Sequence, residues 1–583
     1  MKKICSLLLC VAMLFSVLAV GTGCAKKKDN IDHTKSQLWV CTRDSGLGYN
    51  WLEELAKAFE LKYAETEFEP GTEKKGVQVH VEKSYDNKGD ALPNTLANSK
   101  YSVHWVEAMW YADFMSKDLL YDISDIVDNS LDDGSGSIQS KLSAEQNGYL
   151  TGYDGKYYSL PWFSGFTGIT YDATMFDNEG FFFADADGMI MNPISTYTGK
   201  TYNGRGFVYT GNTKKAPGPD GKYNTYDDGL PSSYEEFFAL LDYIAYKTFD
   251  GIIYTGMSEH YLTYIFHALL AQYAGKEQLS YNFSFNSGDK TADIITDWNG
   301  EEPVITPTKI DKNNGYLMSQ LAGKYYALKF LNCLYRNYDK YFMDDISKSM
   351  SNLDTQEIFL NSSFTTTYTD IAMLVEGNYW YNEAGTARKT WLDNYKDKAR
   401  NREFRFMTLP AKELGTVNEN QGSAPVVVDG LSTYLCINNN IKGDALKEEL
   451  ATKFVKFCFE DASLQLTTTT SGMPVDADYD LTQTQYDDMD KYPQSCWDYF
   501  RASKSAGSYL APVGPSKTYI ANRLTFGYYN GSSYFNTTLD GLPYDSQREV
   551  FTKKKDGQFM YTAKDYFTGM KMSQSDWANY NKD

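Results

Sequence analysis

Aromatic and charged side chains stand together just after short apolar runs of the sequence. Arg43 and Asp44 follow the run that starts at Leu38, while Trp105 and Glu107 end another. Flat aromatic rings stack on the apolar C–H faces of a sugar, and carboxylates and arginine form directed hydrogen bonds with its hydroxyls. These residue types therefore favour noncovalent binding of a carbohydrate.

Two more loops carry the same kind of residue. Tyr379 and Trp380 follow the apolar run "AMLVEG", and Asp429 precedes the run "GLSTYL". In open α/β sheets, ligands bind beyond the carboxyl ends of the strands. The loops that follow the strands are thus the expected site.

The elements that would position these loops alternate between strand and helix. Residues 38–42 predict a strand, and Leu52, Leu55 and Phe59 recur after it at helical spacing. "KKGVQVHVEKS" predicts a second strand, and "YSVHWVEAMWYADF" predicts a third strand followed by a helix. This alternation is typical of an α/β fold with a largely parallel sheet.

An acidic turn offers a possible metal site. "PDGKYNTYDDG" contains Asp220, Asn224, Asp227 and Asp228, whose oxygens could wrap one calcium ion. The turn lacks the spacing and the closing Glu of an EF-hand, so a solvated surface turn is the alternative. We expect no metal and no cofactor.

Cysteine usage argues against disulfides and zinc. Five cysteines follow residue 24, which is an odd number, and no CxxC pair occurs among them. We expect buried free thiols at Cys41, Cys333, Cys436, Cys458 and Cys496.

The N-terminus predicts export. Lys2 and Lys3 precede an apolar run at 4–20 that is short for a membrane span and ends in "GTGC". The end resembles a bacterial lipobox, with Gly21 where Leu is usual, and implies a signal peptide at 1–23 and lipidation of Cys24. An ordinary signal peptide or an uncleaved anchor is the alternative.

The mature chain would then be held to the outer face of the cytoplasmic membrane by lipid alone. Residues 24–35 would form a tether. The formal net charge of the chain is -20, which argues against binding of nucleic acid or anionic lipid.

Five motifs in order resemble the extracellular solute-binding proteins of carbohydrate ABC importers, the maltose-binding-protein-like family 1. They span most of residues 36–478. The motifs are "GYNWLEELAKAFE", "YDGKYYSLPW…GITYDATMF", "LPSSYEEF", "AMLVEGNYWYNEA" and "KEELATKFVKFCFEDASLQ…SGMPV". Residues 181–229 lie outside the match and predict an insertion.

The resemblance implies two α/β lobes, each a mainly parallel sheet flanked by helices, joined by hinge strands. Lobe one would comprise 36–160 and 411–475, and lobe two 161–410 and 476–583. The chain would first cross between lobes at Pro161, because proline lacks an N–H and suits the end of a strand ladder.

The resemblance also assigns roles to aromatic residues. Trp105 would stack on the sugar from lobe one, and either Tyr379 or Trp380 from lobe two. Trp162 and Phe163 would face the cleft floor, unless they belong to the core of lobe two.

The expected function is non-catalytic capture of a carbohydrate, in the first place an oligosaccharide, by a monomer that delivers it to an ABC transporter permease. One alternative is a surface-anchored carbohydrate-active enzyme that pairs Glu107 with Glu376 or Asp429. The sequence contains no GxSxG, HExxH or GxxxxGK[ST] motif to support it. A polyamine or a peptide is the other possible cargo.

Overall fold

The computed structural model describes residues 31–580 of the 583, apart from several internal stretches. These stretches are 44–45, 88–90, 108–116, 153, 187, 189–193, 209–213, 254–259, 344–349, 411–424, 429–432, 511–546 and 570. Cys24, Asp44 and Asp429, and the helix expected after the third strand, lie outside the described residues.

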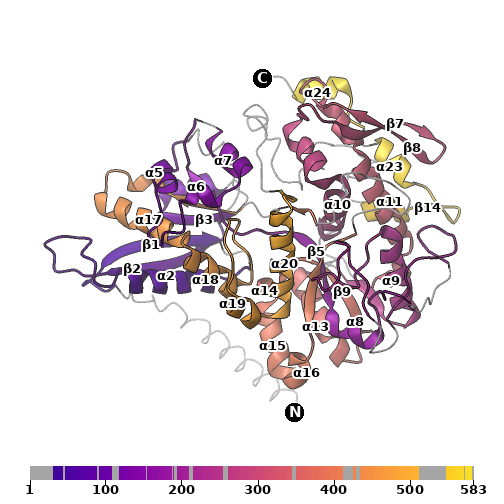
Figure 1. The fold of residues 1–583 in the computed structure, drawn as a ribbon, viewed down its shortest axis with the longest axis horizontal. Coiled ribbons are helices and arrows are strands. Elements are labelled where there is room, and N and C mark those ends of the chain that lie inside the picture. Colours follow the sequence, from indigo (N-terminus) through magenta and orange to yellow (C-terminus); the bar gives the residue numbers. More distant parts are fainter. Residues whose placement is uncertain are drawn as a thin grey trace, which may run out of the picture.

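Lobe one is built on a five-stranded sheet in the order β2-β1-β3-β12-β4 (Figure 1). Its strands are β1 (Ser36–Arg43), β2 (Val77–Ser84), β3 (Val103–Glu107), β4 (Ser159–Pro161) and β12 (Thr433–Ile437). Its helices are α2 (Asn50–Lys62), α3 (Leu92–Asn98), α5 (Ser124–Asp128), α6 (Ile138–Lys141), α7 (Ala144–Thr151), α17 (Ala445–Cys458) and α18 (Asp461–Ser471). The last two helices come from far along the chain and cover the N-terminal sheet.

Lobe two is built on a four-stranded sheet in the order β10-β5-β9-β6. Its strands are β5 (Thr167–Asp172), β6 (Asp250–Ile253), β9 (Ile371–Gly377) and β10 (Phe404–Met407). Around it lie α8 (Ala173–Glu179), α9 (Tyr234–Tyr246), α10 (His260–Ser284), α11 (Ala322–Arg336), α12 (Tyr338–Tyr341), α13 (Asn352–Asn361), α14 (Trp380–Glu383), α15 (Gly385–Tyr395) and α16 (Asp397–Arg400).

Smaller elements complete this lobe. A hairpin of β7 (Ala292–Asn299) and β8 (Glu302–Thr308) projects from it, followed by the 3₁₀ helices η2 (Gly315–Gln320) and η3 (Ser362–Phe364). The C-terminal part adds α19 (Gln483–Asp488), α20 (Lys491–Ser505), α22 (Gln547–Thr552), β14 (Lys554–Lys555), β15 (Gln558–Phe559), α23 (Ala563–Gly569) and α24 (Gln574–Tyr580). Of these, α20 packs on β10, and α22 and α23 pack on α11.

The two-lobed α/β fold is as expected, but the sheets are mixed rather than mainly parallel. In lobe one, β12 runs antiparallel to both of its neighbours, and in lobe two β5 does the same. These are the strands by which the chain enters lobe two and returns to lobe one. A strand that arrives from the opposite lobe enters its sheet from the side that faces that lobe. It therefore runs antiparallel to its neighbours in the sheet.

Local sequence signals account for the helices that frame the sheets. In α2, the buried face is Trp51, Leu52, Leu55, Ala56 and Phe59. At the start of α9, the Ser233 side chain accepts a hydrogen bond from the backbone N–H of Glu236 and caps the helix. The predicted insertion also packs into lobe two, because Phe181, Phe183 and Phe207 are buried in its core.

The expectations for thiols and membrane segments can be compared with the described residues. Cys41, Cys436, Cys458 and Cys496 are free and buried, and Cys333 is free and partly buried. In the part of the chain that the structure describes, no helix combines the length and the apolar character needed to cross a membrane.

Candidate ligand-binding site

The carboxyl ends of β1 and β3 bring two predicted charged residues together. The strands are parallel neighbours, so Arg43 and Glu107 end at the same edge of the sheet. Arg43 Nε lies 3.3 Å from Glu107 Oε2. A second arginine nitrogen donates to the backbone carbonyl of Tyr85, which holds the guanidinium in place.

Four aromatic rings form a wall beside this ion pair. The ring centroids of Trp51, Trp105 and Trp162 lie 5.4 to 5.7 Å apart, and Phe163 lies 5.1 Å from Trp51. Trp162 is fixed by its backbone N–H, which donates to the carbonyl of Thr433 at 2.9 Å. Trp162 and Phe163 therefore pack with lobe one, and the alternative that they belong to the core of lobe two is wrong.

A hollow opens beside this wall. It is lined by residues that include Arg43, Trp51, Trp105, Glu107, Trp162 and Phe163, and it holds about 310 Å³ of empty space, open solvent included. The enclosed part of this space is only about 20 Å³, which is room for about one water molecule. An oligosaccharide would need the lobes to part further.

Two donors in this wall have no partner in the described part of the chain. The indole N–H groups of Trp105 and Trp162 are buried and have no hydrogen-bond partner among the described residues. A buried indole N–H normally finds an acceptor. A ligand oxygen or a water molecule that entered an opened hollow would supply the acceptor that both donors lack among the described residues.

Carboxyl groups of lobe two lie near the same hollow. Glu383, at the end of α14, reaches the lobe-one loop, where a Cβ added to Gly46 would lie 3.1 Å from Glu383 Cγ. The Gln356 amide nitrogen lies 3.0 Å from Glu376 Oε1 and 3.3 Å from Glu383 Oε2. Burial, and to a smaller extent the nearby Glu107, raises the pKa of Glu383 to about 7, although hydrogen bonds from Gln356 and Asn352 oppose the rise.

The lobe-two aromatics lie apart from the hollow. Trp380 is fully buried and packs against Phe359, Phe404 and Tyr492, with centroids 4.9 to 6.2 Å apart. Tyr379 is 5% exposed, and neither residue lines the hollow. Of the residues predicted to bind the ligand, the structure brings Arg43, Trp105, Glu107, Trp162 and Phe163 together around the hollow. Tyr379 and Trp380 do not line it.

The acidic turn is held by its own hydrogen bonds. Asp227 Oδ2 accepts from the backbone N–H of Asp220, Asp228 Oδ2 accepts from that of Asn224, and Thr225 Oγ1 donates to Asp227. Among the described residues, no group of three His, Cys, Asp or Glu side chains is placed to hold a metal ion. Asp220 and Asp227 are buried, so the turn is not the solvated surface turn given as the alternative.

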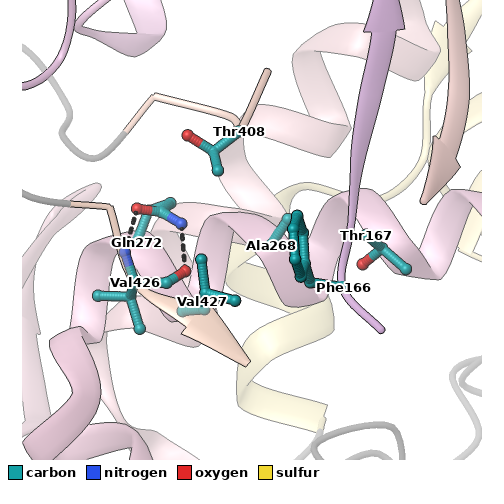
Figure 2. A pocket seen from close by; sticks show the side chains of 8 residues that line it. Phe166, Thr167, Ala268, Gln272, Thr408, Val426 and Val427 are labelled. Carbon is teal, nitrogen blue, oxygen red and sulfur yellow. Dashed lines mark hydrogen bonds between the residues drawn. The ribbon is translucent and has the colours of Figure 1, made fainter. Parts of the chain in front are cut away.

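A second hollow lies where the chain crosses between the lobes (Figure 2). It is lined by Phe166 and Thr167 of the first crossing and by Thr408 and Val426 of the second. The Gln272 side chain of α10 donates to the Val426 carbonyl at 2.7 Å and accepts from the Val426 N–H at 3.1 Å. Both crossings are thus held side by side against α10. After Val426, the short strand β11 (Val427–Val428) pairs with β13 (Tyr509–Leu510).

Sequence reasoning missed three residues of the site. Trp51 stands inside the motif "GYNWLEELAKAFE", and its place at the start of α2, the helix that follows β1, brings it to the hollow. Nothing in the sequence around Gln356 or Glu383 predicts a place in the site. Their side chains come together only when α13 and α14 pack in the folded chain.

Solved structures share this architecture. RafE from Streptococcus pneumoniae, in its apo form, is 12% identical over 95% of this chain and 100% of its own, with a TM-score of 0.50. A chitin oligosaccharide binding protein is 13% identical over 94% of this chain and 99% of its own, also with a TM-score of 0.50. No family model matches the sequence, and no curated protein matches it either. At this identity the likeness establishes the two-lobed fold alone.

Proposed function

We propose that this chain is a non-catalytic solute-binding protein that captures a carbohydrate outside the cell and delivers it to an ABC importer. The observation that supports this most is the tryptophan wall, in which the indole donors of Trp105 and Trp162 have no partner among the residues that the structure describes. It lies at the strand ends of a fold that is shared with a chitin oligosaccharide binding protein. The five ordered sequence motifs point the same way.

An enzyme fits the geometry less well. The nominated partner of Glu107, Glu376, is 1% exposed and accepts hydrogen bonds from Gln356 and from the Gly377 N–H. A carboxyl group that attacks or protonates a glycosidic bond must reach it. Glu376 is therefore better suited to shaping the site than to catalysis.

A saccharide panel tests the function. The protein without residues 1–24 is screened by thermal shift against neutral and amino oligosaccharides, polyamines and peptides. A true ligand raises the melting temperature by mass action. Chromatography of the incubated saccharide should show no product. Stabilisation by polyamines or peptides alone, or turnover of a sugar, would overturn the proposal.

Ligand binding should close the lobes about the paired crossings. Because Gln272 holds Val426 beside Phe166, we expect α10 and the crossings to move as one unit while lobe one rotates. Small-angle scattering should show a smaller radius of gyration with saturating saccharide. An unchanged profile at saturation would contradict closure.

The lipid anchor is a separate proposal that rests on the lipobox-like "GTGC". Cys24→Ser should leave the precursor unprocessed or release the protein into the medium. Fractionation of expressing cells with a labelled fatty acid measures both. A Cys10→Ser variant, inside the signal, is the matched control and should remain anchored and labelled. Normal processing and retention of Cys24→Ser would contradict the proposal.

A further inference from the structure

One aromatic ring stands exposed at the edge of the sheet that carries the site. Tyr85 directly follows β2 and is 70% exposed, more than any other Trp, Tyr or Phe in the described part of the chain. Single exposed apolar side chains are common and need no special explanation. Tyr85 differs because the side chain beside it, Arg43, lines the hollow.

Arg43 holds Tyr85 at the rim of the hollow. A guanidinium nitrogen of Arg43 donates to the Tyr85 backbone carbonyl, and the guanidinium carbon lies 5.7 Å from the centroid of the tyrosine ring. A cation at this distance from the face of a ring is attracted to it. The same guanidinium pairs with Glu107 at 3.3 Å. The ring is therefore tied to the ion pair of the site, and its exposed surface is left for a further partner.

The register of the sheet places Tyr85 and Glu107 at the same level, on either side of Arg43. In the pair of β1 and β2, Arg43 is the partner of Ser84, and Tyr85 is the next residue. The register of β1 and β3 likewise places Glu107 one residue past the level of Arg43. Adjacent strands lie about 4.8 Å apart, so the row from β2 to β3 spans about 10 Å. A single sugar ring is shorter than this row and cannot rest on both of its ends.

We propose that Tyr85 is an outer stacking platform for an oligosaccharide, whose inner unit meets the tryptophan wall and whose outer unit rests on the Tyr85 ring. The apolar C–H face of a sugar stacks on a flat aromatic ring. The enclosed part of the hollow, about 20 Å³, leaves no space inside it for a longer chain, so further units must run outward along the sheet edge.

Arg43 and Glu107 lie between the two stacking places. Their side chains are 17% and 15% exposed, and together they offer donors and acceptors to the hydroxyls of the sugar unit that crosses them. The inference rests on the proposed carbohydrate function and deepens it, because it assigns the ligand a minimum length and a direction along the sheet edge.

Titration calorimetry with saccharides of increasing length tests the inference. The probes are the disaccharide, tetrasaccharide and hexasaccharide of the maltose, cellobiose, xylobiose and chitobiose series. In the series that binds most tightly, the wild type should bind the tetrasaccharide at least about fivefold more tightly than the disaccharide, since the added units bury one face of the Tyr85 ring. Tyr85→Ala should remove most of this gain and leave affinity for the disaccharide within about twofold. Tyr85→Phe keeps the ring and should keep the gain.

Tyr246→Ala is the matched control, because Tyr246 is an exposed tyrosine at the end of α9 in lobe two and does not line the hollow. It should bind every length like the wild type. Both rings are exposed, so neither alanine variant should shift the melting temperature of the free protein appreciably.

Three results would overturn the inference while the carbohydrate function stands. One is a wild type that binds all lengths equally, and another is a gain with length that survives in Tyr85→Ala. The third is an equal loss of affinity for the disaccharide and the tetrasaccharide in Tyr85→Ala, which would mean that Tyr85 acts by holding Arg43 and not by stacking. Binding of no saccharide, from these series or from the thermal-shift panel, would overturn the inference and the proposed function together.

Discussion

Replacing Trp105 with alanine should weaken binding of the tightest saccharide at least about tenfold, which corresponds to about 1.4 kcal/mol. Losing most of one stacked ring forfeits apolar burial at about 25 cal/mol per Å², or about 2 kcal/mol in all. The unpaired indole N–H would add a hydrogen bond worth about 1 kcal/mol. Glu107→Gln should cost less, because it keeps the shape and one acceptor.

The stability of the Trp105 variant must be measured beside its affinity. Trp105 is 3% exposed and contacts Trp51 and Trp162, so its truncation also leaves a cavity that costs about 3 to 5 kcal/mol. Trp105→Phe keeps a ring without the N–H and should lose affinity while keeping more of the fold. Trp298→Ala removes an indole from β7, which does not line the hollow, and should bind like the wild type. If Trp105→Ala binds like the wild type and Glu107→Gln does not, the stacking hypothesis is wrong.

Features of the fold that depend on nearby residues could be predicted from the sequence. The helical spacing of Leu52, Leu55 and Phe59 predicts the buried face of α2, as the structure confirms. The meeting of Arg43 and Glu107 could also be predicted, because a parallel sheet places the carboxyl ends of its strands at one edge. The family resemblance supplied the two lobes, which periodicity alone does not give.

Features that depend on distant pairing could not be predicted. Gln356 meets Glu376 and Glu383 only because α13, β9 and α14 pack together. The direction of a strand in its sheet also depends on distant pairing. Nothing in "TYLCI" predicts that β12 runs antiparallel to β3 and β4. Tyr379 and Trp380 follow a strand, as a binding residue would, yet the turn after Gly377 directs Trp380 into the core. An aromatic residue that follows a strand can either bind a ligand or fill the core. Only the packing of the folded chain decides which of the two it does.

Replacing Arg402 with methionine should lower the free energy of unfolding by about 3 to 5 kcal/mol, since it leaves a buried charge unpaired. Arg402 Nε lies 2.5 Å from Asp172 Oδ2, and the two side chains are 5% and 3% exposed. The other guanidinium nitrogens donate to the carbonyls of Leu360 and Phe359. The arginine thus joins β5 to the end of α13. Its loss takes a donor from Asp172 Oδ2 and from the Leu360 and Phe359 carbonyls, of which the Phe359 carbonyl still accepts from Ser362 Oγ.

The matched control is Arg400→Met, two residues earlier. Arg400 pairs with Asp397, but these side chains are 68% and 89% exposed, and such pairs are worth about 0 to 1 kcal/mol. Asp172→Asn should cost less than Arg402→Met, because the amide oxygen can still accept from the Met175 N–H that it caps. Combining Asp172→Asn with Arg402→Met should recover part of the loss, since it removes the unpaired charge. Urea and thermal unfolding of the four variants measure these differences. Equal midpoints for Arg402→Met and Arg400→Met would mean that the buried pair adds nothing, and that apolar packing around Phe359 and Phe404 holds β5 to α13 instead.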